Sequence, residues 1–249
     1  MDCSNNVILL TGCTSGIGLE FLHYLYGHNI IIAVSRSDHK LRHLKKDFPL
    51  INTFKCDLNN PEEVRQLILY CQENFKSLNV IINCAGIEEN QYWTNYEESA
   101  LSSLEKEIDT NLVSPLKIIR GLVPVLVNQK HAAIINITSG LALIPKKDAI
   151  VYCASKAGLS LATKALRMQL KDYSSVKVFE VLPPLIDTPM TRLNTHSKLS
   201  AKKLIEEIIT GLKNDRYEIY PGKMKWAYLL YKISPGLVNL LFKIRNRLR

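Results

Sequence analysis

The sequence predicts a doubly wound α/β domain, in which a parallel sheet of about seven strands has helices on both faces. Two observations predict this class. Short runs rich in Val, Ile and Leu alternate with longer segments of helical periodicity, and small polar or Gly-containing turns follow several of the apolar runs. No linker, low-complexity segment or internal repeat divides the 249 residues, so we expect a single domain.

The elements alternate in order along the chain. Strands are expected at 7–11, 29–35, 51–56, 79–84, 132–138, 176–182 and 216–220. Helices are expected at 17–27, 39–47, 61–75, 98–128, 152–172 and 200–213. We expect residues 1–222 to form the domain and residues 223–249 to extend it.

The first predicted strand ends in a glycine turn. The run Val7-Ile8-Leu9-Leu10 leads into Thr11-Gly12-Cys13-Thr14-Ser15-Gly16-Ile17-Gly18, which opens a helix. Glycines let the backbone approach a pyrophosphate closely, and the helix N-terminus offers N–H groups to it. An ordinary Gly-rich turn is the alternative that this motif alone leaves open.

A possible acid–base pair lies later in the chain. Tyr152 and Lys156 are four residues apart in a predicted helix, so they project from the same face. A nearby cation stabilises a phenolate, whose parent phenol has a pKa of about 10, and a Tyr tuned in this way is a general acid or base. Tyr and Lys at this spacing also occur by chance on solvated helix edges.

These two motifs together resemble the short-chain dehydrogenase/reductase family, whose patterns are Thr-Gly-x-x-x-Gly-x-Gly and Tyr-x-x-x-Lys. Further matches follow in family order over nearly the whole chain: Cys56-Asp57-Leu58, Asn83-Cys84-Ala85-Gly86, Asn111, Ser139, and Pro183 with Thr188. The segment from Gly140 to Pro145 and the pair Pro183-Pro184 look most like the DltE-type oxidoreductases.

The resemblance implies a Rossmann-type fold, a nicotinamide cofactor and a catalytic tetrad. Tyr152 would exchange a proton with the substrate oxygen, Lys156 would lower the pKa of Tyr152 and hold the ribose, Ser139 would bond the substrate oxygen, and Asn111 would hold a relay water. It also implies that the cofactor contacts Gly12, Thr14, Ser15, Gly16, Ile17, Gly18, Ser35, Arg36, Asp57, Leu58, Asn83, Ala85, Gly86, Tyr152, Lys156, Pro183, Ile186 and Thr188.

The end of the second strand bears on the choice of cofactor. Ser35 and Arg36 stand where NAD-binding relatives carry an acid, and an arginine fork with a hydroxyl suits a 2′-phosphate. This favours NADP(H). Asp38 would be the ribose ligand of an NAD(H) enzyme if the register shifts, and it is otherwise an N-cap residue.

The substrate is less well defined by the sequence. A substrate loop is expected at about 184–200, and the candidate walls 87–93, 141–144 and 185–199 are rich in apolar side chains, which suits an apolar carbonyl compound or secondary alcohol. Pro184 stands where many relatives have glycine, and its fixed φ angle predicts that the loop with Ile186 and Thr188 approaches the nicotinamide differently. A non-catalytic dinucleotide sensor on the same fold is an alternative.

Composition addresses location and partners. Six scattered cysteines without metal-ligand spacing, no signal-peptide pattern and no long apolar run favour a cytoplasmic protein without metal. The net charge of +9 lacks the pattern of a nucleic-acid-binding module.

Much of that charge lies in residues 223–249, which carry seven basic residues and no acid. A basic amphipathic helix is expected after Pro235-Gly236. It would lie on a membrane, where a peripheral enzyme would act on lipid-like substrates, or pack on the domain or on a second subunit of a homodimer or homotetramer.

Overall fold

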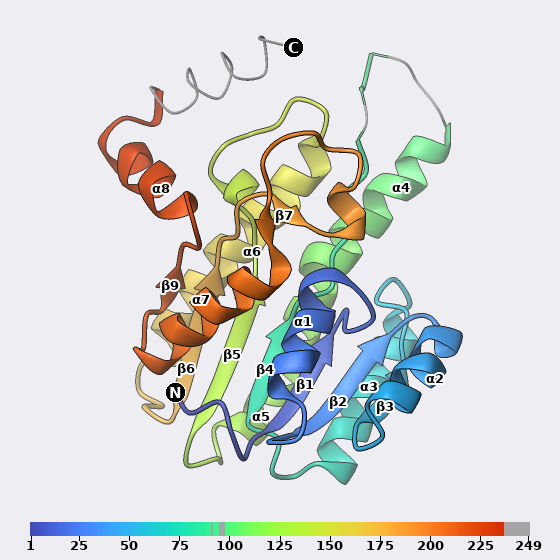
Figure 1. The fold of residues 1–249 in the computed structure, drawn as a ribbon. Helices are drawn as coiled ribbons and strands as arrows, with labels where there is room; N and C mark the ends of the chain where they lie inside the picture. The colour runs from blue at the N-terminus through green and yellow to red at the C-terminus, as the bar shows by residue number, and fades with distance from the viewer. Residues whose placement is uncertain (91, 95–97, 237–249) are drawn as a thin grey trace.

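A computed structural model describes residues 1–90, 92–94 and 98–236 (Figure 1). Its main sheet has seven strands in the order β3-β2-β1-β4-β5-β6-β9, and every neighbouring pair is parallel. The strands are β1 (Val7–Thr11), β2 (Ile30–Ser35), β3 (Asn52–Lys55), β4 (Val80–Asn83), β5 (Ala132–Ile137), β6 (Val176–Val181) and β9 (Glu218–Ile219). The prediction of a doubly wound parallel sheet is confirmed.

Helices cover both faces of the sheet (Figure 1). The side chains of α1 (Gly16–Leu25), α2 (Asp38–Asp47) and α7 (Ala201–Lys213) pack on one face, and those of α3 (Pro61–Asn74), α5 (Ser114–Leu126) and the end of α6 (Ile150–Gln169) pack on the other. The remaining described helices are α4 (Glu98–Ile108) and α8 (Met224–Ile233).

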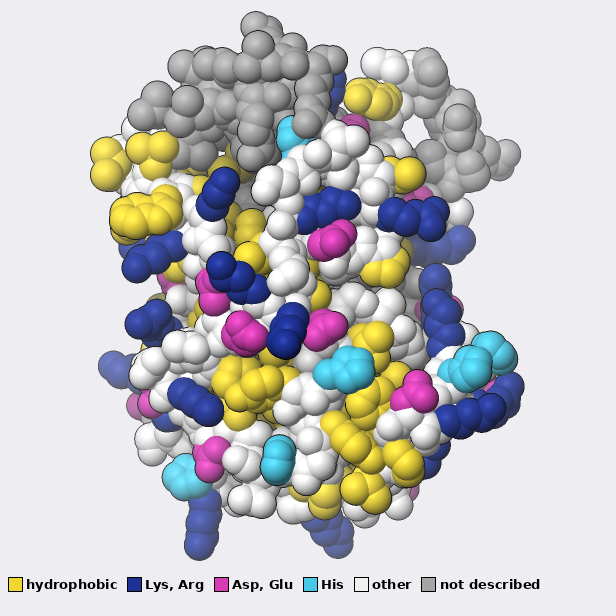
Figure 2. Space-filling model, viewed as in Figure 1, with side chains coloured by type: hydrophobic (Ala, Val, Ile, Leu, Met, Phe, Trp, Pro, Cys, Tyr) yellow, Lys and Arg dark blue, Asp and Glu magenta, His cyan; other side chains and the backbone are white. Residues whose placement is uncertain are grey.

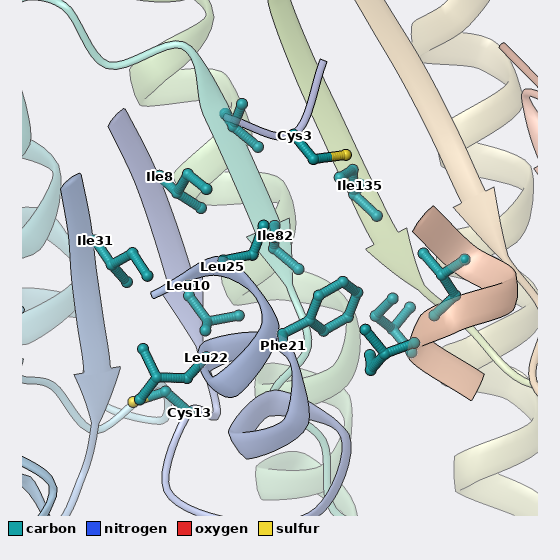
Figure 3. Close-up of a cluster of buried hydrophobic side chains, with 14 of the residues drawn as sticks. Cys3, Ile8, Leu10, Cys13, Phe21, Leu22, Leu25, Ile31, Ile82 and Ile135 are labelled. Carbon is teal, nitrogen blue, oxygen red and sulfur yellow. The ribbon is translucent and has the colours of Figure 1, made fainter. Parts of the chain in front are cut away.

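The buried strands supply both cores because their side chains alternate in direction. In β1, Ile8 and Leu10 belong to the cluster that includes Phe21 of α1, shown in Figure 3, whereas Val7 and Leu9 belong to the cluster on the opposite face. Phe21 is completely buried. A strand that is apolar on both faces therefore fixes the middle of a three-layer domain.

Two segments differ from the sequence-based expectation. The helix expected over 98–128 is divided by a π-helical turn, Asp109–Val113, between α4 and α5. Helix α8 begins at Met224, before the Pro235-Gly236 pair after which a helix was expected. That expected helix lies outside the described residues.

A second, two-stranded sheet pins the segment after β6. Its strands β7 (Ile186–Asp187) and β8 (Leu199–Ser200) pair in parallel, and Leu199 N donates to Leu185 O at 3.0 Å. Between them lies a 3₁₀ turn, Pro189–Thr191, with a second such turn, Gly140–Ala142, after β5. Among the described residues, no helix has the length and apolar composition required to cross a membrane.

Candidate active site

A cleft of about 270 Å³ opens at the carboxyl ends of β1 to β4. Its walls are the glycine turn, the residues that follow β2, β3 and β4, and Thr188 to Met190. Strand order reverses between β1 and β4, which is where ligands bind in open α/β sheets.

The glycine turn of this cleft has a shape that requires glycine. Gly12 and Gly16 have φ angles of +72° and +53°, in the left-handed region. A Cβ on Gly18 would lie 2.1 Å from Gly12 O. Thr14, Ser15 and Ile17 line the cleft with these glycines, as the motif predicts, so the turn forms a cradle from which side chains are excluded.

The next wall carries positive charge. Ser35 and Arg36 line the cleft, and so does Lys40, which the sequence analysis did not single out. Ser35 Oγ lies 3.4 Å from Thr14 Oγ1. Asp38 lies outside the residues that line the cleft, and its carboxylate pairs with Arg42 one turn along α2.

Residues after β3 and β4 complete the cleft. Asp57, Leu58, Ala85 and Gly86 line it, and their contacts with a cofactor stay predictions. Asn83 is instead buried in the sheet, where its Nδ2 donates to Asn136 Oδ1 at 2.9 Å. The side chain of Asn83 thus joins β4 to β5 and does not line this cleft, and the cofactor contact predicted for this residue stays a prediction.

The four tetrad residues converge on the N-terminal part of α6. Tyr152 and Lys156 are both buried, with 9% and 3% of their surface exposed. Lys156 Nζ lies 5.6 Å from the centre of the Tyr152 ring and donates to Ile137 O at 3.0 Å. Ser139 forms a side-chain hydrogen bond with Tyr152.

Gly86 joins the cleft to this tetrad. It lines the cleft, and a Cβ on it would lie 3.3 Å from Asn111 Oδ1 and 3.4 Å from Lys156 Nζ. The buried Asn111 lies in the π-helical turn. At this point only the backbone of Gly86 separates the cleft from the side chains of Asn111 and Lys156.

Burial controls the proton affinities of the pair. It lowers the pKa of Lys156 to about 8, although Cys84 and Glu107 oppose the shift. Burial also raises the pKa of Tyr152, with a further contribution from Glu88, while the hydrogen bond from Ser139 opposes it. The net shift of the Tyr152 pKa is upward in this structure because desolvation of the phenolate outweighs the favourable interactions, and the lowering contributed by Lys156 stays a prediction.

Glu107 is a site residue that the sequence analysis missed. It is 1% exposed, and burial raises its pKa to about 7, with Glu89 and Glu88 adding to the rise and Lys156 opposing it. Its Oε1 accepts from Glu89 N at 3.4 Å. In the sequence, Glu107 stands four residues before Asn111, and this spacing could have indicated that both belong to the site.

Thr11 opens the glycine motif of the sequence, but its role in positioning a neighbouring loop was not predicted. Its Oγ1 accepts from Cys84 N at 3.1 Å and from Ala85 N at 3.2 Å. This hydroxyl ties the start of the glycine turn to the loop after β4, and its place directly after the apolar run of β1 is the signal in the sequence.

Of the three residues predicted after β6 to contact the cofactor, only Thr188 lines the cleft, whereas Pro183 and Ile186 do not. Thr188 lines the cleft and lies against Gly16, with 3.1 Å between its Cγ2 and the position of a Gly16 Cβ. Ile186 is buried in the core, and Pro183 O accepts from Gly140 N at 3.0 Å. The loop that contains Pro184 thus still brings Thr188 into contact with the glycine turn.

No group of three or more His, Cys, Asp or Glu side chains in the described ranges is arranged to hold a metal ion. All six cysteines are free thiols. Burial raises the pKa of Cys13 and of Cys84 to about 12, which keeps both protonated at neutral pH.

Comparison with known proteins identifies the family. A family model described as short chain dehydrogenase matches residues 6–198. The chain is 34% identical over 228 residues to the uncharacterized oxidoreductase DltE of Bacillus subtilis (strain 168), a match that spans 88% of this chain and 89% of that protein. The chain therefore belongs to the short-chain dehydrogenase family.

Solved structures share the fold. A short chain dehydrogenase from Burkholderia cenocepacia J2315 in complex with NADP has a TM-score of 0.82 and 24% identity, covering 94% of this chain and 95% of that one. A short chain dehydrogenase/reductase from Burkholderia phymatum in complex with NAD has a TM-score of 0.79 and 16% identity, covering 88% and 89%. At these identities the likeness concerns the fold.

Proposed function

We propose that this protein is an NADP(H)-dependent oxidoreductase that interconverts a carbonyl group and a secondary alcohol. The observation that carries the proposal is the closeness of Gly86 to Lys156, because it places the glycine-lined cleft beside a buried Tyr–Lys pair. Family membership supports the same reaction class.

The residues that line the cleft could hold a nicotinamide dinucleotide. The glycine turn and the N-terminus of α1 would hold the pyrophosphate through backbone N–H groups. Asp57 and Leu58 would flank the adenine, and Ala85 and Gly86 the adjoining ribose. When bound, the cofactor would supply or accept the hydride.

Preference for NADP(H) rests on the charge beside the ribose site. Arg36 and Lys40 line the cleft, and a phosphate dianion would neutralise both. Asp38, the residue that would favour NAD(H), is engaged with Arg42. The same fold carries NADP in one solved relative and NAD in another, so the preference depends on these side chains.

The tetrad would manage the proton. Tyr152 would donate its proton to the carbonyl oxygen during reduction, for which its raised pKa is suitable because the phenol stays protonated at neutral pH. Ser139 would hydrogen-bond the same oxygen, and Lys156 would hold the nicotinamide ribose. Asn111 would connect Lys156 to solvent through a water.

The substrate would be an apolar carbonyl compound or alcohol. Leu141 and Leu143 are partly exposed beside Ser139, and the loop between β7 and β8 presents Met190 and Leu193. Apolar walls with few polar groups are typical of pockets that take apolar substrates. A lipid-like carbonyl compound belongs to this class.

Assembly and location complete the proposal. Leu161 and Met168 lie seven residues apart on α6 and are 71% and 79% exposed, which supports a homodimer or homotetramer that buries this face. Six free thiols support a cytoplasmic location.

Cofactor titration and turnover test the function together. Purified protein is titrated with NADPH and with NADH, and NADPH oxidation is then followed with a panel of ketones, aldehydes and quinones. We expect tighter binding of NADPH and turnover of at least one apolar carbonyl. Tight binding without turnover of any panel member would favour the dinucleotide-sensing alternative, and absence of binding would refute both.

A further inference from the structure

Helix α8 has two apolar faces. One faces the domain: Met224 is 5% exposed, and Tyr228 stacks on Tyr220 with ring centres 4.0 Å apart. Both hydroxyls point to Glu218 Oε2, at 2.6 Å from Tyr220 and 3.4 Å from Tyr228. These contacts fix how the helix is rotated about its axis.

The opposite face of α8 is apolar and open to solvent. Trp226, Leu229 and Ile233 are 70%, 44% and 82% exposed, and their spacing of three and four residues places them in one row. We call these three residues the α8 stripe. Contacts of the other face attach the helix to the domain, and the stripe stays largely exposed.

The charged side chains of α8 itself are all positive. Lys223, Lys225 and Lys232 lie on or next to α8, and residues 223–236 include no Asp or Glu. Figure 2 shows apolar and basic side chains side by side over α8, at the upper left. An aromatic and aliphatic row beside lysines is typical of helices that lie in the interface of an anionic bilayer.

Other exposed apolar residues lie at the same end of the molecule. Met190 and Leu193 lie in the loop after β6, and Tyr92 and Trp93 lie in the loop after β4. Because all strands of the main sheet are parallel, loops that follow strands share the end at which the cofactor cleft opens, the upper end in Figure 1. Leu193 is 90% exposed.

We propose that this end of the molecule docks on an anionic lipid bilayer, with the α8 stripe entering the interface beside the mouth of the active site. A second copy of the chain fits the stripe less well. A twofold contact through α8 would bring its lysines against those of the partner, where like charges repel. The docking proposal rests on the exposed surface and does not require the reaction proposed above.

Tryptophan emission provides a direct test, because the two tryptophans of the chain are Trp93 and Trp226. The Trp93→Phe variant retains Trp226 alone as reporter. Mixed with phosphatidylglycerol-containing vesicles, it should show a blue-shifted emission that brominated acyl chains quench. Binding to pure phosphatidylcholine vesicles should be weaker, and salt should weaken the binding to anionic vesicles.

Co-sedimentation with a matched pair of variants assigns the binding to the stripe. Ile233→Glu removes one stripe residue and should lower partitioning to anionic vesicles by about tenfold or more, because an apolar side chain is lost from the interface and a like charge is added. Leu50→Glu makes the same charge change at a residue that is 73% exposed and precedes β3, at the opposite end of the sheet. Its partitioning should remain within about twofold of the parent, since only the long-range charge changes.

Three results would overturn the proposal. The first is protein that stays in the supernatant with unchanged emission in the presence of anionic vesicles. The second is an equal loss of binding in Ile233→Glu and Leu50→Glu, which would show a non-specific charge effect. The third is a vesicle-independent, concentration-dependent blue shift of Trp226 together with a doubled mass in light scattering, which would assign the stripe to a second copy. Cofactor binding measured on the same samples reports separately on the proposed function.

Discussion

Asn111 holds the backbone of Ile87 from both sides. Its Oδ1 accepts from Ile87 N at 2.9 Å, and its Nδ2 donates to Ile87 O at 2.8 Å. The second Nδ2 proton goes to Ser155 Oγ at 3.1 Å, and that hydroxyl donates to Tyr152 O at 2.8 Å. One side chain thus connects the loop after β4 to the helix that carries Tyr152.

This clamp changes the role expected of Asn111. Both amide protons have protein acceptors, so the side chain has no N–H left to donate to a relay water. A relay water would therefore donate to the second lone pair of Asn111 Oδ1 or bind to the backbone of the π-helical turn. The proton relay remains a proposal.

Replacing the proton donor tests the catalytic assignment. Tyr152→Phe should lower kcat by about 10²- to 10⁴-fold, because a positioned general acid contributes that much. NADPH affinity should change little, since the ring and the Lys156 contacts remain. Stopped-flow reduction and fluorescence titration measure the two quantities. Tyr173→Phe, at a residue that is 51% exposed, is the control, and a Tyr152→Phe enzyme as active as this control would disprove the mechanism.

Charge reversal beside the ribose site tests cofactor preference. Arg36→Asp removes a cation from the cleft and should shift the ratio of the NADPH and NADH dissociation constants by about 100-fold toward NADH, the equivalent of about 2.7 kcal/mol. Arg120→Asp is the matched control, because it makes the same charge change at an exposed residue of α5 that does not line the cleft. Equal ratios in the two variants would remove Arg36 from the phosphate site.

A single methyl group tests the shape of the phosphate cradle. Gly18→Ala would place a Cβ 2.1 Å from Gly12 O, so the turn must shift at a cost of about 1–3 kcal/mol. We expect a lower melting temperature and weaker NADPH binding. Gly236→Ala is the control, since no atom of the described residues, its chain neighbours apart, lies within 4 Å of its added Cβ. An unchanged dissociation constant in Gly18→Ala would contradict the placement of the pyrophosphate.

Glu107 should make stability depend on pH. Its pKa in the folded protein, about 7, exceeds the ordinary 4.5, so its contribution to stability is complete below pH 4.5 and is lost as the pH rises to 7. Glu107→Gln lacks this loss. Its free energy of unfolding, relative to the parent, should therefore rise between these pH values, by roughly 3 kcal/mol at most.

Thermal melts across that pH range measure the effect. Glu105→Gln, an exposed change on the same helix, is the control. If the Glu107→Gln and parent curves stay parallel from pH 4.5 to pH 7.5, the carboxyl does not titrate where its burial predicts.

The exposed face of α6 tests the assembly. Leu161→Glu places a charge on a face that a homodimer or homotetramer would bury, so the molar mass in light scattering should fall to that of a monomer of 28.3 kDa. Leu50→Glu again serves as the surface control. A parent protein that is already monomeric at micromolar concentration would contradict the proposed oligomer.

The sequence alone determined the order of the layers and the presence of the cleft. Apolar runs such as Val7–Leu10 identify buried strands, and the strand–glycine–helix order locates the phosphate cradle, because both depend on residues that are near one another in the chain. Tyr152 and Lys156 meet for the same reason, being one helical turn apart. Features that depend only on neighbouring residues can therefore be predicted from the spacing of residues in the sequence.

Only the tertiary structure decided how distant residues meet. Asn83 bonds Asn136 because β4 and β5 pair in one register, and Glu107 acts on Lys156 because α4 packs beside α6. The direction in which the pKa of Tyr152 shifts depends on how far the folded chain removes the phenol from water. The α8 stripe could be recognised only in the structure, because the contacts with Tyr220 and Glu218 show which face of the helix packs on the domain. Strand register, desolvation and the choice of buried face depend on contacts between residues that are far apart in the chain. The local spacing of residues in the sequence therefore does not predict them.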